Sequence, residues 1–194
     1  VKFALKSQEA GVDAIVAEGF EAGGHNGREE TTTLTLIPMV KAAISLPLIA
    51  AGGIATGGAM LAATALGADG VQVGSRFVAS DEASSHPNFK NEVIKAVEGS
   101  TVLTLKEITP VRMLKNPFFQ KIAALYENGA DAEELKSTLG RGRAKKGMFE
   151  GDLEEGELEI GQIAGLINEV LPAAQIVQNL IEEYNHTLKR IKEI

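Results

Sequence analysis

One unit occurs twice in the sequence and restricts the fold more than any other feature. The segments "LKSQEAGVDAIVAEG" (5–19) and "LAATALGADGVQVGS" (61–75) each run from a helical pattern through Gly-x-Asp-[Ala/Gly]-[Ile/Val] into a short apolar strand and then glycine. Gly11 and Gly67 stand where the end of a helix needs a left-handed residue. Between the copies, "TLIPMVKAAISLPLIAAGG" (35–53) predicts another helix, loop and strand. The pattern therefore predicts alternating helices and strands.

These elements indicate a parallel sheet. We expect strands at about 13–17, 48–51 and 71–74 and helices at about 1–10, 36–45 and 57–66. Short apolar strands that alternate with helices are typical of parallel sheets, which occur in open doubly wound folds and in (β/α)8 barrels. In both folds the function lies in loops at the carboxyl ends of strands. Each predicted strand here leads directly into glycine, at Gly19, Gly52–Gly53 and Gly74.

A barrel fits these loops better than a dinucleotide fold. Barrels often bind phosphate with the loops after their last two strands, and the sequence has no GxGxxG fingerprint. We therefore predict an α/β fold in which residues 1–77 are the last three strand–helix units of a (β/α)8 TIM barrel. A whole barrel needs roughly 250 residues. Because the chain starts inside a helical pattern without methionine, we expect about five further strand–helix units before Val1.

Residues 78–194 are expected to form a helical extension packed on the barrel. The pattern predicts a helix over 86–99, then a short strand and loop over 100–116. Two helices separated by Gly129 follow, and the charged, glycine-rich stretch 141–161 predicts a surface loop. Residues 162–194 predict one or two amphipathic helices, with Pro172 able to start the second.

Composition excludes several classes of function. The formal net charge of −7 and the absence of a dense basic face argue against a nucleic-acid or anionic-membrane partner. The sequence contains no run of 18 apolar residues, so it predicts no membrane span. The absence of cysteine excludes disulfides, iron–sulfur clusters and thiolate zinc sites, and it fits a cytoplasmic location. With a single well-placed histidine, we expect no metal site.

Two glycine loops predict a site for a phosphate-bearing ligand. "AAGGIATGGAM" (50–60) follows one predicted strand, and "VGSRF" (73–77) follows the next. Glycines let the backbone approach an anion closely, and free N–H groups at such turns can bind phosphate oxygens. The alternative is that each loop is an ordinary turn with glycines for tight packing. Because two such loops on neighbouring parallel strands can converge on one group, we favour phosphate binding.

His25 is the candidate catalytic residue. It lies in "GFEAGGHNG" (19–27), after the first predicted strand and at the same end of the sheet. A histidine titrates near neutrality and suits proton transfer. Glu18 and Glu21 flank the same strand end. The alternatives for each are a second titrating group and a loop carboxylate held by backbone N–H groups, and we favour the loop carboxylate. His86 and His186 are expected to be solvated.

Four segments together resemble a known family. They are "AEGFEAGGHNG" (17–27), "PLIAAGGIATG" (47–57), "ALGADGVQVGSRF" (65–77) and "EGDLEEGELEIGQIAGLI" (150–167). In this ordered combination the chain resembles the FMN-dependent barrel oxidoreductases that include nitronate monooxygenase (2-nitropropane dioxygenase) and the flavin-type enoyl-acyl-carrier-protein reductase. The resemblance implies FMN as cofactor, with its phosphate held by loops 52–54 and 74–76, and His25 facing the flavin. The cofactor-binding residues that it implies are Gly24, Ala51, Gly52, Gly53, Ile54, Val73, Gly74, Ser75 and Arg76.

The resemblance leaves the reaction open. The first interpretation is oxidation of alkyl nitronates with oxygen. The alternative is an enoyl-acyl-carrier-protein reductase that uses NAD(P)H as co-substrate, which the tail and "REETTT" (28–33) resemble somewhat more. Met39 and Gly58 depart from the residues that are common in relatives, which puts the substrate in doubt. A non-catalytic barrel that binds a phosphate ligand is the third alternative. We expect a small-molecule substrate (a nitronate or an enoyl thioester), a homodimer and, for a reductase, an acyl carrier protein as partner.

Overall fold

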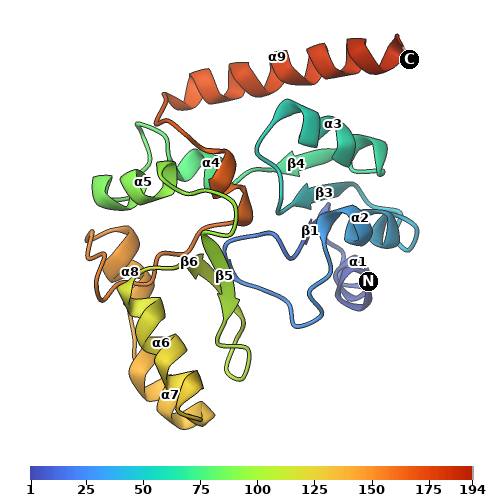
Figure 1. Cartoon of the computed structure of the whole chain (residues 1–194). Helices are drawn as coiled ribbons and strands as arrows, with labels where there is room; N and C mark the ends of the chain where they lie inside the picture. The colour runs from blue at the N-terminus through green and yellow to red at the C-terminus, as the bar shows by residue number, and fades with distance from the viewer. Residues whose placement is uncertain (194) are drawn as a thin grey trace.

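The computed structural model describes residues 1–193 and contains two separate sheets (Figure 1). The first sheet is parallel, in the order β1-β3-β4, with β1 at Ile15–Glu18, β3 at Leu48–Ala51 and β4 at Gly70–Gln72. Its helices are α1 (Lys2–Glu9), α2 (Thr33–Lys41) and α3 (Gly57–Ala65). The predicted parallel strands and their alternating helices are therefore confirmed, with ends that differ by a few residues.

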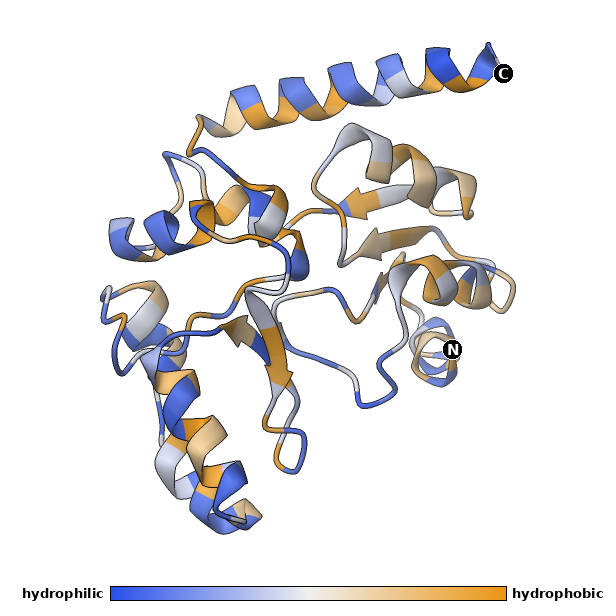
Figure 2. Ribbon diagram, viewed as in Figure 1, coloured by the Kyte–Doolittle hydropathy of each residue, from blue (hydrophilic) through white to orange (hydrophobic). Residues whose placement is uncertain are grey.

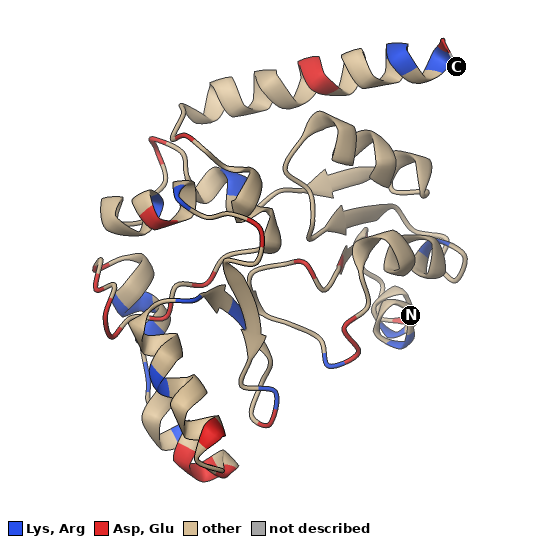
Figure 3. Ribbon diagram, viewed as in Figure 1, with Lys and Arg blue, Asp and Glu red and all other residues tan. Residues whose placement is uncertain are grey.

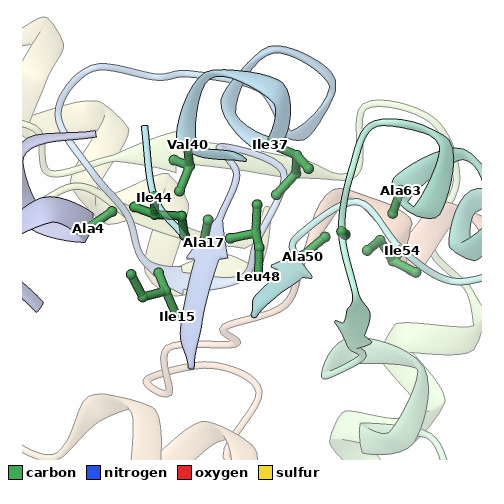
Figure 4. Close-up of a cluster of buried hydrophobic side chains, with 11 residues drawn as sticks. Ala4, Ile15, Ala17, Ile37, Val40, Ile44, Leu48, Ala50, Ile54 and Ala63 are labelled. Atoms are coloured by element: carbon green, nitrogen blue, oxygen red, sulfur yellow. The ribbon is translucent and has the colours of Figure 1, made fainter. Parts of the chain in front are cut away.

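One face of the parallel sheet forms a hydrophobic core. The register aligns Ile15 with Leu48 and Ala17 with Ala50, and these side chains are buried. They pack against Ile37 and Val40 of α2 and against other members of the same cluster (Figure 4). Burial of this apolar surface fixes the three helices on one side of the sheet.

The opposite face of the sheet is open. Val16 is 48% exposed, and Glu18 and Gln72 are also exposed. The register places Val16 beside Ile49, and Glu18 beside Ala51 and Gln72, on this face. Among residues 1–193, no second layer of helices covers it. Parallel sheets almost always have both faces covered.

The second sheet is antiparallel, in the order β2-β6-β5. It consists of β2 (Gly24–His25), β5 (Thr101–Thr104) and β6 (Val111–Leu114). The prediction of a single short strand and loop over 100–116 was wrong, because this stretch is a hairpin. Its second strand pairs with the segment that carries His25. The sheet thus joins the first 77 residues to the region that follows them.

The remaining chain adds short helices around this second sheet. They are α4 (Ser75–Val78), α5 (Pro87–Ile94), α6 (Pro117–Glu127), α7 (Ala132–Leu139), α8 (Arg143–Met148), the 3-10 helix η1 (Gln162–Leu166) and α9 (Ala173–Lys192). Pro172 is the N-cap of α9, as predicted. None of the helices in the described part of the chain is long and apolar enough to cross a membrane. Figure 2 shows that α9 alternates hydrophilic and hydrophobic residues along its length.

The prediction of a surface loop over 141–161 was wrong. Residues 143–148 form α8, and Glu157, Leu158 and Ile160 are buried in an extended segment. Leu158 and Ile160 enter a core cluster with Phe89 and Val93 of α5. The glutamates that alternate with these apolar residues lower the mean hydropathy of the stretch, although its alternation is that of a half-buried strand.

Helix α9 packs closely on α3 at the start of the latter. A Cβ atom at Gly57 would overlap the α9 backbone at Leu180 and Tyr184. The Gly57 N–H donates a hydrogen bond of 2.8 Å to the Glu183 carboxylate. The first N–H of α3 is therefore already bound by α9, and it is not free for a ligand.

Candidate functional site

A cavity of about 270 Å³ lies at the carboxyl ends of the three parallel strands. It is closed on another side by the segment Glu159–Gly161 and by Gly23 and Gly24. Seven of the nine cofactor-binding residues that the sequence predicts line this cavity. They are Gly24, Ala51, Gly52, Gly53, Ile54, Gly74 and Ser75.

The turn after β3 requires glycine. Gly52 has φ +82° and Gly53 has φ +72°, in the left-handed region that side chains disfavour. A Cβ at Gly52 would lie 2.7 Å from the carbonyl oxygen of Gly19, in the turn after β1. The Thr33 hydroxyl lies 2.8 Å from the Gly52 carbonyl oxygen. The turn is therefore fixed by close packing against the neighbouring strand end and by the start of α2.

Free backbone donors line the cavity. In the described residues, no backbone–backbone hydrogen bond uses the N–H of Gly53, Gly74 or Ser75 as donor. A Cβ at Gly74 would meet nothing within 4 Å, so open space lies beside this residue. The Ser75 hydroxyl oxygen accepts a hydrogen bond of 2.9 Å from the Gly161 N–H, which ties this loop to the far wall. Such donors suit an anionic ligand.

Two of the predicted cofactor-binding residues, Val73 and Arg76, do not line the cavity. The Arg76 guanidinium donates hydrogen bonds to the carbonyl oxygens of Ala79 (3.3 Å) and Glu169 (3.2 Å). Val73 packs against the core cluster of the parallel sheet. The structure therefore places the Arg76 side chain on backbone carbonyls, where it joins the β4 loop to the chain near α9.

The acidic residues near β1 have different roles. The Glu21 carboxylate accepts hydrogen bonds from the Thr33 N–H (3.0 and 3.1 Å), which confirms that it is held by a backbone donor. Glu18 lines the cavity, and partial burial raises the pKa of its carboxyl. "REETTT" thus supplies, through Thr33, a link between the β1 and β3 loops and the start of α2. Figure 3 shows acidic residues on the connection from β1 to α2 and between α8 and η1.

His25 has more support than its glycine neighbours suggested. It belongs to β2, opposite Val111 of β6, and its side chain is exposed. It is adjacent to Gly24, which lines the cavity, but it is not itself among the lining residues. His186 is exposed as expected, whereas His86 is half-buried and caps α5 through a hydrogen bond from the Asn88 N–H to its Nδ1 atom. The described residues hold no group of three His, Cys, Asp or Glu side chains that could bind a metal ion.

The sequence reasoning missed two glutamates of the segment that closes the cavity. Glu159 lines the cavity; burial raises the pKa of its carboxyl, and the positive charge of His25 lowers it. Glu157 is 5% exposed, and its Oε1 atom has no hydrogen-bond partner among residues 1–193. Burial, followed by the like charge of Glu159, raises the pKa of Glu157 to about 7. The signal for both residues was their alternation with Leu158 and Ile160.

Together, the parallel sheet and its convergent glycine loops define an α/β protein with a cavity, lined by backbone N–H groups, at the carboxyl edge of the sheet. The particular family follows from comparison with known proteins: the family model described as nitronate monooxygenase matches residues 1–183, and the chain belongs to this family.

Individual relatives agree with this assignment. A probable nitronate monooxygenase of Staphylococcus saprophyticus is 30% identical over 98% of this chain and 56% of the relative. Among solved structures, FabK from Thermotoga maritima is 41% identical with a TM-score of 0.91, over 99% of this chain and 60% of that one. A nitroalkane oxidase from Streptomyces ansochromogenes is 30% identical with a TM-score of 0.78, over 98% of this chain and 56% of that one. The chain thus spans about half the length of the curated relatives that it matches.

The buried carboxyl of Glu157 predicts that stability falls as pH rises. Its pKa is near 7 in the folded protein and about 4.5 when unfolded, so the folded state binds more protons between these values. The free energy of unfolding should therefore decline from pH 4.5 to pH 8. We expect Glu157→Gln to match the parent near pH 4.5 and to exceed its stability at pH 8 by up to about 3 kcal/mol, measured by urea denaturation. If the variant and the parent differed by the same free energy of unfolding at both pH values, the raised pKa of Glu157 would be contradicted.

Proposed function

We propose that this chain is the carboxyl-terminal part of a (β/α)8 barrel that binds FMN and oxidises alkyl nitronates with oxygen. The observation that carries the proposal is the convergence of two glycine loops, from adjacent parallel strands, on one cavity in a chain of the nitronate monooxygenase family. The cytoplasmic location and the homodimer stay predictions.

The open face of the sheet supports the barrel. Val16, Glu18 and Gln72 point away from the helix-covered core and are exposed. In a barrel, the residues of this face point into the interior and pack against those of the other strands. The helices α1 to α3 already occupy the side on which a barrel carries its outer ring. Further strands beside β1 and β4 would cover the face and remove both sheet edges.

The donor set of the cavity fits a flavin phosphate. Gly53, Gly74 and Ser75 offer unpartnered N–H groups, and a Cβ at Gly74 would enter open space. No lysine or arginine lines the cavity within the described residues, so the backbone would provide the hydrogen bonds. The N–H of Gly57 is bound to Glu183, which leaves the β3 and β4 loops as the phosphate site. A bound flavin would supply the two-electron redox chemistry.

His25 would handle the proton in the reaction. It lies next to the cavity wall at Gly24 and is held there by β6. An imidazole at this place can accept a proton from a neutral nitroalkane or orient a nitronate, because it changes its charge near neutral pH. The glycines around it leave room for a substrate at the cavity mouth.

A second candidate function is supported by the degree of similarity. Identity to FabK, an enoyl-acyl-carrier-protein reductase, is 41%, whereas identity to the nitroalkane oxidase is 30%. For such a reductase, NAD(P)H would be the reductant, His25 would donate a proton to the product, and an acyl carrier protein would present the substrate.

An anaerobic spectrum of the full-length, flavin-loaded protein distinguishes the candidates. Loss of the visible flavin absorbance after addition of a nitronate, but not of NADH, is the result that we expect. Rapid loss with NADH alone would replace the first candidate by the reductase. Protein that retains no flavin after gentle purification and shows no redox activity would contradict both candidates and favour a non-catalytic phosphate-ligand-binding barrel.

Gly74 tests the phosphate site without disturbing the fold. Its backbone lies in the right-handed region, and a Cβ there meets no protein atom within 4 Å. We expect Gly74→Val to keep the thermal stability of the flavin-free protein and to weaken FMN binding at least about tenfold by crowding the ligand. The affinity is measured by flavin fluorescence. Gly58→Ala serves as the control, because Gly58 lies outside the cavity, has no positive φ, and a Cβ there meets only the Thr187 and Thr56 hydroxyls at 3.7 and 3.8 Å. Unchanged FMN affinity in Gly74→Val would remove the β4 loop from the site.

His25→Ala tests the proposed proton transfer. The full-length variant should keep its flavin, because the His25 side chain does not line the cavity. Turnover in steps that need proton transfer should fall by about 10²–10⁴-fold. Flavin reduction by a preformed nitronate or NADH should largely survive. A variant that turns over every substrate at the parent rate would make His25 an ordinary exposed residue.

A further inference from the structure

Strand β6 holds His25 and Glu159 along one edge. His25 lies opposite Val111, and Glu159 forms an antiparallel bridge with Met113, two residues further along. Directly opposite residues of an antiparallel pair share a face of the sheet, and so do residues two apart on a strand. Val111 and Met113 do share a face, because both enter the same core cluster. The register therefore places His25 and Glu159 on one face, about 6.6–6.8 Å apart along the strand direction.

The Glu159 carboxyl lies beside the residue that precedes His25. A Cβ at Gly24 would be 2.8 Å from the Glu159 Oε2 atom. Glu159 also lines the cavity, whereas Glu157, on the same extended segment, does not. Burial raises the pKa of the Glu159 carboxyl, and the charge of His25 opposes that effect. The two groups are thus close enough in space for the charge of His25 to act on the Glu159 carboxyl.

The other charged side chains near the cavity are carboxylates or have partners other than Glu159. The charged residues that line the cavity, within the described chain, are Glu18, Glu21 and Glu159. Arg112 of β6 is directed elsewhere, because its guanidinium donates to the Phe20 carbonyl oxygen (2.9 Å) and stacks 4.5 Å from the Phe20 ring. The charge of Arg143 lowers the pKa of Glu157, and its guanidinium forms an ion pair with Glu155. The structure therefore pairs Glu159 with His25 rather than with Arg112 or Arg143.

We propose that Glu159 is a positioning residue that stabilises the imidazolium form of His25, so that a proton is held ready at the cavity mouth. The inference deepens the proposed function and rests on His25 acting in its protonated form, as the donor that orients a nitronate or supplies a proton. A carboxylate near an imidazole favours its charged form. Since Glu159 belongs to the segment that closes the cavity, the same segment would set both the shape of the cavity and the proton state of its histidine.

The first experiment is a titration of full-length, flavin-loaded protein labelled with ¹³C at the glutamate carboxyls. Glu159→Gln identifies the Glu159 resonance by its loss. We expect His25→Gln to raise the Glu159 titration midpoint by about half a pH unit or more, because a positive neighbour has been removed. His186→Gln, at an exposed position of α9, should leave the midpoint unchanged. An unchanged midpoint in His25→Gln would overturn the inference.

The second experiment measures the pH profile of the proton-dependent step. Without the Glu159 carboxylate, the high-pH limb of the rate profile should move to lower pH. At pH values above this limb, the rate should fall about tenfold for each pH unit by which the limb moves. Glu159→Gln should show this change with unaltered flavin content, and Glu159→Asp should recover part of the rate. If His25→Ala has parent rates, the proposed function of His25 fails. If His25 is required but Glu159→Gln has the parent profile, only the present inference fails.

Discussion

The approach of the β3 turn to the β1 turn is the constraint on which the site depends. At Gly52 the backbone passes so close to the Gly19 carbonyl that a side chain would not fit, and it does so with a positive φ. Thr33 adds a hydroxyl that lies near both the Gly52 carbonyl and the Glu21 carboxylate. These contacts bring two strand ends and the start of α2 together. They leave the Gly53 N–H without a backbone acceptor, next to the loop after β4.

The second sheet gives the cavity its other wall. Strand β6 pairs with β2 and bridges to Glu159, so one buried strand aligns two segments that are distant in the sequence. Gly23 is part of this joint, because a Cβ there would overlap the backbone at Ile160 and Gly161. Apolar residues of the same extended segment anchor it in the core beside α5. His25 and Glu159 therefore lie along a strand of one sheet, and the glycine loops belong to the other sheet.

The sequence was sufficient where the structure is determined by local periodicity. The helices and strands of the parallel sheet, and the turns at Gly52 and Gly74, follow from apolar runs that end in glycine. It was insufficient where pairing is made at long range. Two residues at 24–25 carry no strand pattern of their own, and β2 exists only because β6 lies beside it. Glu157 and Glu159 were hidden because a charged stretch predicts a loop, although burial of Leu158 and Ile160 holds it as an extended segment. Arg76 shows that a basic residue beside a glycine loop can instead donate hydrogen bonds to backbone carbonyl oxygens.

We propose that the loops after β3 and β4 hold one phosphate group. A crystal structure of the full-length protein with FMN bound tests this directly. In that structure we expect the phosphate oxygens to accept hydrogen bonds from the backbone N–H groups of Gly53, Gly74 and Ser75, within about 3.2 Å. A phosphate bound elsewhere, with these three N–H groups directed to water or to other parts of the protein, would contradict it.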